Sequence, residues 1–169
     1  MALDTTIGGA AADSYGTLAA FEAYASTMGW TLTGGAADHN AVMRRAALYL
    51  DRNYIWIGGK ATQAAARQWP RNISELVDGF AVPGNSIPMP IIYAQFELAW
   101  IAHGGTDLFA TVTTGAISKA KVKVDVIEES FEYKSPKEHP LFTSIEGMIA
   151  PYHTGNRLGG GFGSIGLVR

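Results

Sequence analysis

The sequence predicts a mainly α-helical fold: a small helical bundle with a β-strand or hairpin extension and extended N- and C-terminal arms. Three segments, at about 17–28, 38–53 and 88–103, repeat apolar residues at the spacing of one helical face. From Lys119 the period changes to two, which is typical of a half-buried strand. A return strand would place the β extension at about 119–133.

The central helix is expected to run from Asp38 to Asn53. Asp38 can accept a hydrogen bond from a backbone amide of the first turn, and neither Gly nor Pro interrupts the chain before Gly58. The apolar stripe is wide and its residues are mostly small, which lets another helix approach closely: Val42, Met43, Ala46, Ala47 and Leu50.

Four charged residues of this helix fall outside the stripe: Arg44, Arg45, Asp51 and Arg52. Two interpretations are open, a solvated face with local ion pairs or a dedicated anion site, and the first is the commoner arrangement.

An apolar segment, 54–57, follows the central helix and is reversed by Gly58 and Gly59. Thr62 can then cap a short helix over 63–68. Pro70 disfavours helical geometry at Trp69, so this helix should stop there, with the indole closing the core.

The remaining elements follow from capping residues and breakers. Thr17 is expected to cap the first helix, and Pro88 suits the start of the third, which continues to His103. Turn dipeptides make 72–87 a surface loop, and a short helix over 141–149 is stopped by Pro151.

Length and composition bound the organisation of the chain. With 169 residues it is expected to form one domain, here 17–151, with an N-terminal arm over 1–16 and a Gly-rich C-terminal arm over 152–169. The absence of cysteine excludes disulfides and thiolate chemistry. No apolar run approaches the length of a membrane span, so we expect a soluble protein without a secretion signal.

The motifs give no support to an enzyme, a cofactor or a metal. Residues 161–166 match GxGxxG, but no helix can follow within the three residues that remain. Residues 58–62 resemble a phosphate loop without its first glycine, so we expect a turn. The histidines are scattered, and none has a second ligand type at helical spacing: His39, His103, His139 and His153.

Two features favour an interaction role. Lys119, Lys121 and Lys123 alternate along the expected strand and are candidate contacts for phosphates or a partner, although a solvated edge is the commoner arrangement. The C-terminal arm is unusually apolar for a linker, so it is expected to bind a partner, through Tyr152, Phe162, Ile165, Leu167, Val168 and Arg169.

Several short runs in order resemble one known family, the head-tail adaptor (connector) proteins of tailed phages, many of which carry the description "putative DnaT-like". The resemblance spans about 12–151. The most specific piece is Trp-Pro-Arg at 69–71, and the others are 13–18, 44–46, 58–62 and 95–99.

The resemblance implies a structural role in the virion, at the neck of the portal vertex, after assembly in the host cytoplasm. It implies a homo-oligomeric ring, dodecameric in the family, that docks on the portal protein and joins it to the next neck or tail protein. Genomic DNA would pass through the lumen without sequence-specific recognition, and no membrane would be involved.

The alternative is a DnaT-like single-stranded DNA-binding replication protein. Such a protein needs a basic groove interleaved with exposed aromatic side chains. The net charge of −2 and the apolar contexts of Trp56, Trp69 and Trp100 favour the adaptor.

Overall fold

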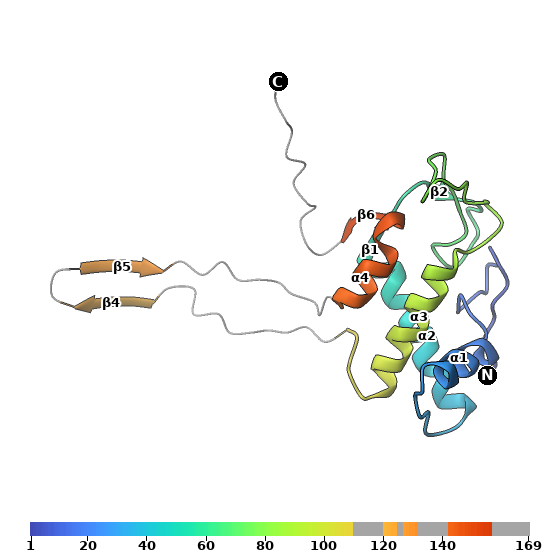
Figure 1. The fold of residues 1–169 in the computed structure, drawn as a ribbon, viewed down its shortest axis with the longest axis horizontal. Helices are drawn as coiled ribbons and strands as arrows, with labels where there is room; N and C mark the ends of the chain where they lie inside the picture. Colours follow the sequence, from blue (N-terminus) through green and yellow to red (C-terminus); the bar gives the residue numbers. More distant parts are fainter. Residues whose placement is uncertain (110–119, 125–126, 132–141, 157–169) are drawn as a thin grey trace.

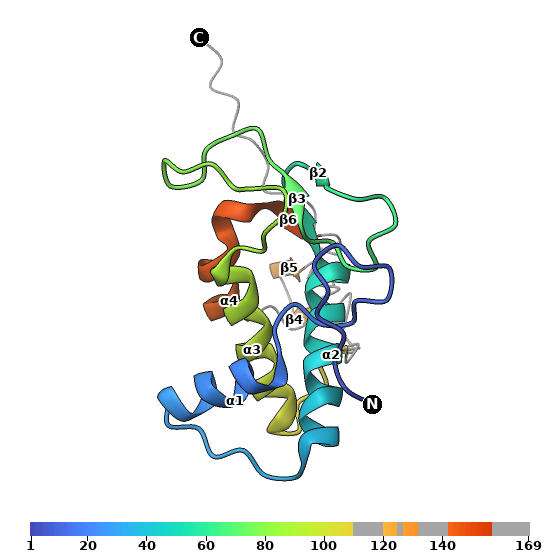
Figure 2. The same cartoon turned by 90° about the vertical axis from the view of Figure 1, so that its right-hand side faces the viewer.

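A computed structural model describes residues 1–109, 120–124, 127–131 and 142–156. Figures 1 and 2 show α2 and α3 side by side, with α1 across one end of the pair and α4 against α3. The helices are α1 (Leu18–Thr27), α2 (Ala36–Asn53), α3 (Met89–His103), α4 (Thr143–Ile149) and the 3-10 turn η1 (Ala150–Tyr152). The expected mainly α fold is confirmed.

The described strands form three antiparallel pairs, β1 with β6, β2 with β3, and β4 with β5. Their bounds are β1 (Tyr54–Trp56), β2 (Gly59–Lys60), β3 (Arg71–Asn72), β4 (Ala120–Val124), β5 (Ile127–Phe131) and β6 (His153–Asn156). The sequence leaves a single strand or a hairpin open, and the structure shows the antiparallel pair, with Val124 opposite Ile127. The pairing of β1 with β6 was not expected.

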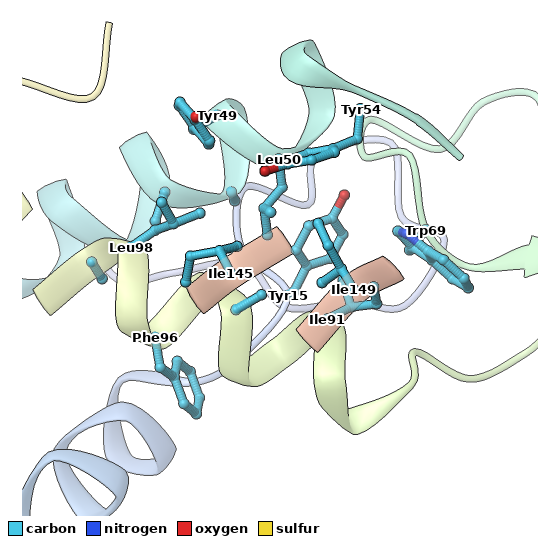
Figure 3. Packing of buried hydrophobic residues seen from close by; sticks show 14 of the residues in the cluster. Tyr15, Tyr49, Leu50, Tyr54, Trp69, Ile91, Phe96, Leu98, Ile145 and Ile149 are labelled. Carbon is cyan, nitrogen blue, oxygen red and sulfur yellow. The ribbon is translucent and has the colours of Figure 1, made fainter. Parts of the chain in front are cut away.

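The core lies between the helices and the β1–β6 pair. Figure 3 shows side chains from α2, α3 and α4 meeting there, together with Tyr15 from the N-terminal segment. Trp69 is 1% exposed, which confirms that its indole closes the core. The expected solvated position of Asp51 is wrong, since its side chain is only 10% exposed.

Asp51 joins three parts of the chain. Its carboxylate accepts hydrogen bonds from the Tyr15 hydroxyl, from Arg67 Nη1 at 3.1 Å and from the Gln68 amide at 3.3 Å. Burial raises the pKa of Asp51, although these donors favour its charged form. The network also explains why the helix expected over 63–68 is absent. Residues 63–68 form turns instead, because Arg67 and Gln68 are directed to Asp51.

The start of α2 also differs from expectation. The N-cap is Gly35, and Asp38 occupies the third helical position, where its Oδ2 accepts the Gly35 amide at 3.1 Å. Asp38 thus contributes the side-chain half of a capping box, which satisfies the amide of Gly35 rather than an amide of the helix.

The side chain of Gln95, which is fully buried, ties the N-terminal segment to α2 and α3. Its Oε1 accepts the amides of Tyr15 and Gly16, each at 3.0 Å. Its Nε2 donates to Ser14 Oγ at 2.7 Å and to the Met43 carbonyl at 2.9 Å. Both donors and both acceptor positions of the carboxamide are therefore used.

The close approach at this point requires glycine. A Cβ on Gly16 would lie 2.5 Å from Cε1 of Phe96, inside the distance that real contacts allow. Gly16 therefore lets the N-terminal segment lie directly on α3.

We expect Gln95→Leu to lower the free energy of unfolding by about 3 kcal/mol or more, because it leaves buried amides without an acceptor. Chemical denaturation measures the change. Gln63→Leu, at an exposed position of the turn region, is the control and should change stability little. Equal losses of stability in the two variants would show that the hydrogen bonds of Gln95 do not stabilise the fold.

Trp69→Ala should lower the free energy of unfolding by about 3 to 5 kcal/mol, the usual cost of deleting a large buried aromatic side chain. The same denaturation assay applies. A change below about 1 kcal/mol, within the range of surface substitutions, would contradict the buried position of the indole.

Candidate functional site

Five aromatic side chains form a continuous row over α1 and α3, which we call the aromatic row. Tyr93 stacks on Tyr24 with ring centroids 4.9 Å apart, and Tyr24 meets the edge of Trp30 at 5.6 Å. Trp30 lies nearly parallel to Trp100, at 4.9 Å and 6°, and Trp100 stacks on His103 at 5.5 Å. The row therefore runs through three stacked pairs of rings.

The helix geometry explains how the row assembles. Tyr93, Trp100 and His103 are separated by seven and three residues, so they share one face of α3. Trp30 is placed by the end of α1. The chain turns at Gly29 with φ 72°, and the Trp30 amide donates to the Ala25 carbonyl at 2.8 Å. This is a Schellman motif, which fixes the direction in which the chain leaves the helix.

The row is accessible to solvent. Tyr93 is 36% exposed, and the other members are neither fully buried nor fully exposed. The Tyr24 hydroxyl donates to Glu97 Oε1 at 3.2 Å, and burial, together with the Glu97 charge, raises the pKa of Tyr24. Tyr24 therefore stays a neutral ring at physiological pH.

The far end of the row is held by two histidines. Nε2 of His39 lies 3.1 Å from the Thr33 carbonyl, and Nε2 of His103 lies 2.9 Å from the same oxygen. Nδ1 of His39 lies 3.1 Å from Glu22 on α1. These contacts hold the connection between α1 and α2, which carries Trp30, against the end of α3.

Two exposed arginines on α2 lie beside the segment that follows α3, and we call them the arginine pair. Arg45 Nη2 lies 2.6 Å from Asp107 Oδ1. The Arg52 guanidinium lies 5.7 Å from the ring centroid of Phe109 and, within the described residues, has no carboxylate partner. The expected solvated face is thus correct for Arg45 and Arg52, which are seven residues apart on one side of α2.

The other described arginines are engaged in the fold. Arg44 pairs with Asp13 at 2.5 Å, and Arg67 pairs with Asp51. Arg71 is buried and donates to backbone carbonyls, among them that of Ile57 at 2.7 Å. The arginine pair is therefore the guanidinium surface that the described body presents to solvent.

The candidate residues from the sequence are not brought together with these surfaces. Lys121 and Lys123 lie in β4, opposite Ser130 and Glu128, while Lys119 lies outside the described residues. So do five members of the expected arm: Phe162, Ile165, Leu167, Val168 and Arg169.

The interpretation of Tyr152 as an arm residue is corrected by the structure. It is 8% exposed, packs against Trp69 with ring centroids 5.9 Å apart and accepts the Ile57 amide at 3.0 Å. Tyr152 is a core residue because the chain continues into β6, which pairs with β1.

The weaker motifs add no chemistry in the described part of the chain. Gly58 has φ 66°, so the chain reverses there as expected, but Gly59 and Lys60 then form the strand β2 rather than a turn. Lys60 Nζ donates to the Ala65 carbonyl at 2.5 Å. The GxGxxG match and His139 lie outside the described residues, and no cluster of metal-ligating side chains occurs among those described. None of the described helices is long and apolar enough to cross a membrane.

A known protein-family model matches residues 1–169 of the chain. The matching model describes a "Putative DnaT-like ssDNA binding protein". The chain belongs to this family. Neither a curated protein nor a solved structure shows significant similarity to the chain.

This membership corrects the expected head-tail adaptor. The family is described by binding to single-stranded DNA, and no finding points to a virion neck, a portal protein or a connector ring. The expectation that DNA merely passes through a ring without recognition is also contradicted, because the family is described as binding single-stranded DNA. The family's description names a binding protein.

The sequence interpretation missed the aromatic row. The apolar surroundings of Trp100 in the sequence favour a core position, whereas its ring lies in the row. The spacing of Tyr93, Trp100 and His103 marks a second stripe on α3, distinct from the core stripe, and it was available in the sequence. The contribution of Trp30 was not available, because it depends on how the connection after α1 folds back.

Proposed function

We propose that this protein binds single-stranded DNA without turnover, with the aromatic row stacking on bases. The observation that carries the proposal is the family match over the whole chain, together with a solvent-accessible row of stacked rings on one face of the body. Base stacking on aromatic side chains tolerates any sequence because every base has a π-face. Duplex DNA, whose bases are already stacked, offers no such partner.

The accessible end of the row is Tyr93. It is the most exposed of the five rings, and its inner side is stacked on Tyr24, which fixes its orientation. A ring held in this way loses little conformational freedom when a base stacks on it. Tyr93 is therefore the first side chain that a base would meet.

Arg52 of the arginine pair supplies positive charge that the aromatic row lacks, whereas Arg45 is already paired with Asp107. Glu22 and Glu97 lie beside the row, so the phosphates of a bound strand would favour the α2 side of the body. Along the chain the two surfaces are close at the end of α3: His103 belongs to the row, and Asp107, four residues later, pairs with Arg45. Lys119, Lys121 and Lys123 remain proposed additional phosphate contacts.

Tyr93→Ala should weaken the binding of a fluorescent oligothymidine by roughly 5-fold to 150-fold, the equivalent of about 1 to 3 kcal/mol for one stacked base. Fluorescence anisotropy at fixed salt measures the dissociation constant. Phe80→Ala removes a more exposed aromatic side chain away from the row and should leave the affinity unchanged. Tyr93→Phe keeps the ring and should bind like the original protein.

The proposal is contradicted if the unmodified protein fails to bind the oligothymidine, or if it binds duplex DNA of the same length equally well. Equal losses in the Tyr93→Ala and Phe80→Ala variants would contradict the assignment to the aromatic row.

Arg52→Gln should reduce the salt dependence of binding. For single strands, each neutralised phosphate contributes about 0.7 to the slope of log affinity against log salt, so the slope should become shallower by about that amount. Titrations at several salt concentrations measure it. Lys60→Gln removes one positive charge elsewhere and is the control, because Lys60 is bound to the Ala65 carbonyl. An unchanged slope for Arg52→Gln would exclude its phosphate contact.

A further inference from the structure

A groove of about 480 Å³ lies between the β1–β6 pair and the turn at 75–80, away from the aromatic row. Trp56, Ile57 and Val77 contribute apolar side chains to it, and Glu75 and Asp78 are the acidic residues that line it. We call it the acid-lined groove. Figure 2 shows the loop that follows β3 and the strand β6 at the same end of the body.

One side of the groove is a rigid turn. Val77 and Phe80 exchange two backbone hydrogen bonds of 2.9 Å, with Asp78 at φ 51° and Gly79 at φ 83° between them. Two central residues with positive φ are the mark of a type I′ turn. The turn fixes the backbone on either side of it. Leu76 is 65% exposed and Phe80 is 77% exposed, so both apolar side chains reach solvent.

The opposite side is also fixed and holds an unpaired donor. Trp56 is 5% exposed, and its Nε1 is buried without a hydrogen-bond partner in the described structure. Arg71 holds the end of β1 in place by donating to the carbonyl of Ile57, the residue that follows this strand. An occupant with apolar side chains would cover Leu76, which also lines the groove.

We propose that residues 157–169 of the same chain dock in the acid-lined groove. The segment begins directly after β6, and Thr154 of β6 is itself a lining residue. Thirteen residues reach up to about 45 Å when extended, far more than this distance requires.

The chemistry of the segment matches the groove. Arg157 and Arg169 are its charged side chains, both positive, and face acidic Glu75 and Asp78 in this arrangement. The segment also carries apolar side chains for the groove and for Leu76: Leu158, Phe162, Ile165, Leu167 and Val168.

The sequence favours docking in the same chain over docking in a second copy. Glycines at 159–161 stand between β6 and the apolar residues, and glycine allows the reversal that brings the segment back to the groove. A short flexible tether gives an effective concentration in the millimolar range. At ordinary protein concentrations, the segment of the same chain should therefore occupy the groove more often than the segment of a second molecule.

The absence of cysteine allows a direct test. Ser164→Cys creates a single thiol in the full chain, and a nitroxide attached there broadens the NMR signals of nearby amides. We expect strong broadening at Leu76, Val77 and Thr154. It should persist after dilution with an excess of protein that carries neither nitroxide nor isotope label.

The double variant Glu75→Gln with Asp78→Asn removes the negative charge of the groove and should reduce the broadening at least several-fold. Asparagine is used at position 78 because it tolerates the positive φ there. Glu128→Gln with Glu129→Gln removes the same charge from β5 and should leave it unchanged.

Two results overturn the proposal. Absence of broadening at these amides excludes docking in the groove. Broadening that appears only when nitroxide-labelled protein is mixed with isotope-labelled protein shows that the occupant is a second copy. The experiment contains no DNA, so its outcome is independent of the proposed function, which would fail by loss of oligothymidine binding instead.

Discussion

The carboxamide of Gln95 is the interaction on which the arrangement of the body depends. It is fully buried on α3, and its four hydrogen bonds reach the N-terminal segment and the backbone of α2. A buried amide is costly unless every donor and acceptor is used, so only one placement of these three segments satisfies it. Asp51 acts in the same way nearer the end of α2, joining Tyr15 to residues 67–68.

This fixed placement explains why an aromatic row can stay accessible without collapsing into the core. The core side of α3 is already occupied by α2 and by the N-terminal segment, so the rings on the other stripe have only α1 and its following connection to pack against. Tyr24 and Trp30 come from that thin layer. The result is a set of rings that are stacked on one another, and therefore ordered, yet still reach solvent.

The electrostatics of the body are uneven in a way that suits a polyanion with unpaired bases. Arg44 and Arg67 pair with the partly buried carboxylates of Asp13 and Asp51, and Arg71 donates to backbone carbonyls, so these three arginines add little to the field at the surface. Both members of the arginine pair are exposed on α2, and Arg52 has no carboxylate partner within the described residues. A net charge of −2 therefore says little about local binding, since the positive charge available to a ligand depends on which arginines the fold consumes.

The sequence by itself determined the mainly α fold, the approximate ends of α1, α2 and α3, the strand β4 and the buried position of Trp69. These follow from local periods, from caps such as Thr17 and from breakers such as Pro88, all of which act within a few residues. Only the tertiary structure decided the turns at 63–68, the burial of Tyr152 and the pairing of β1 with β6. It also decided the aromatic row. Each depends on partners far apart in the chain, such as Asp51 with Gln68 or Trp30 with Trp100, and no local pattern encodes which distant groups meet.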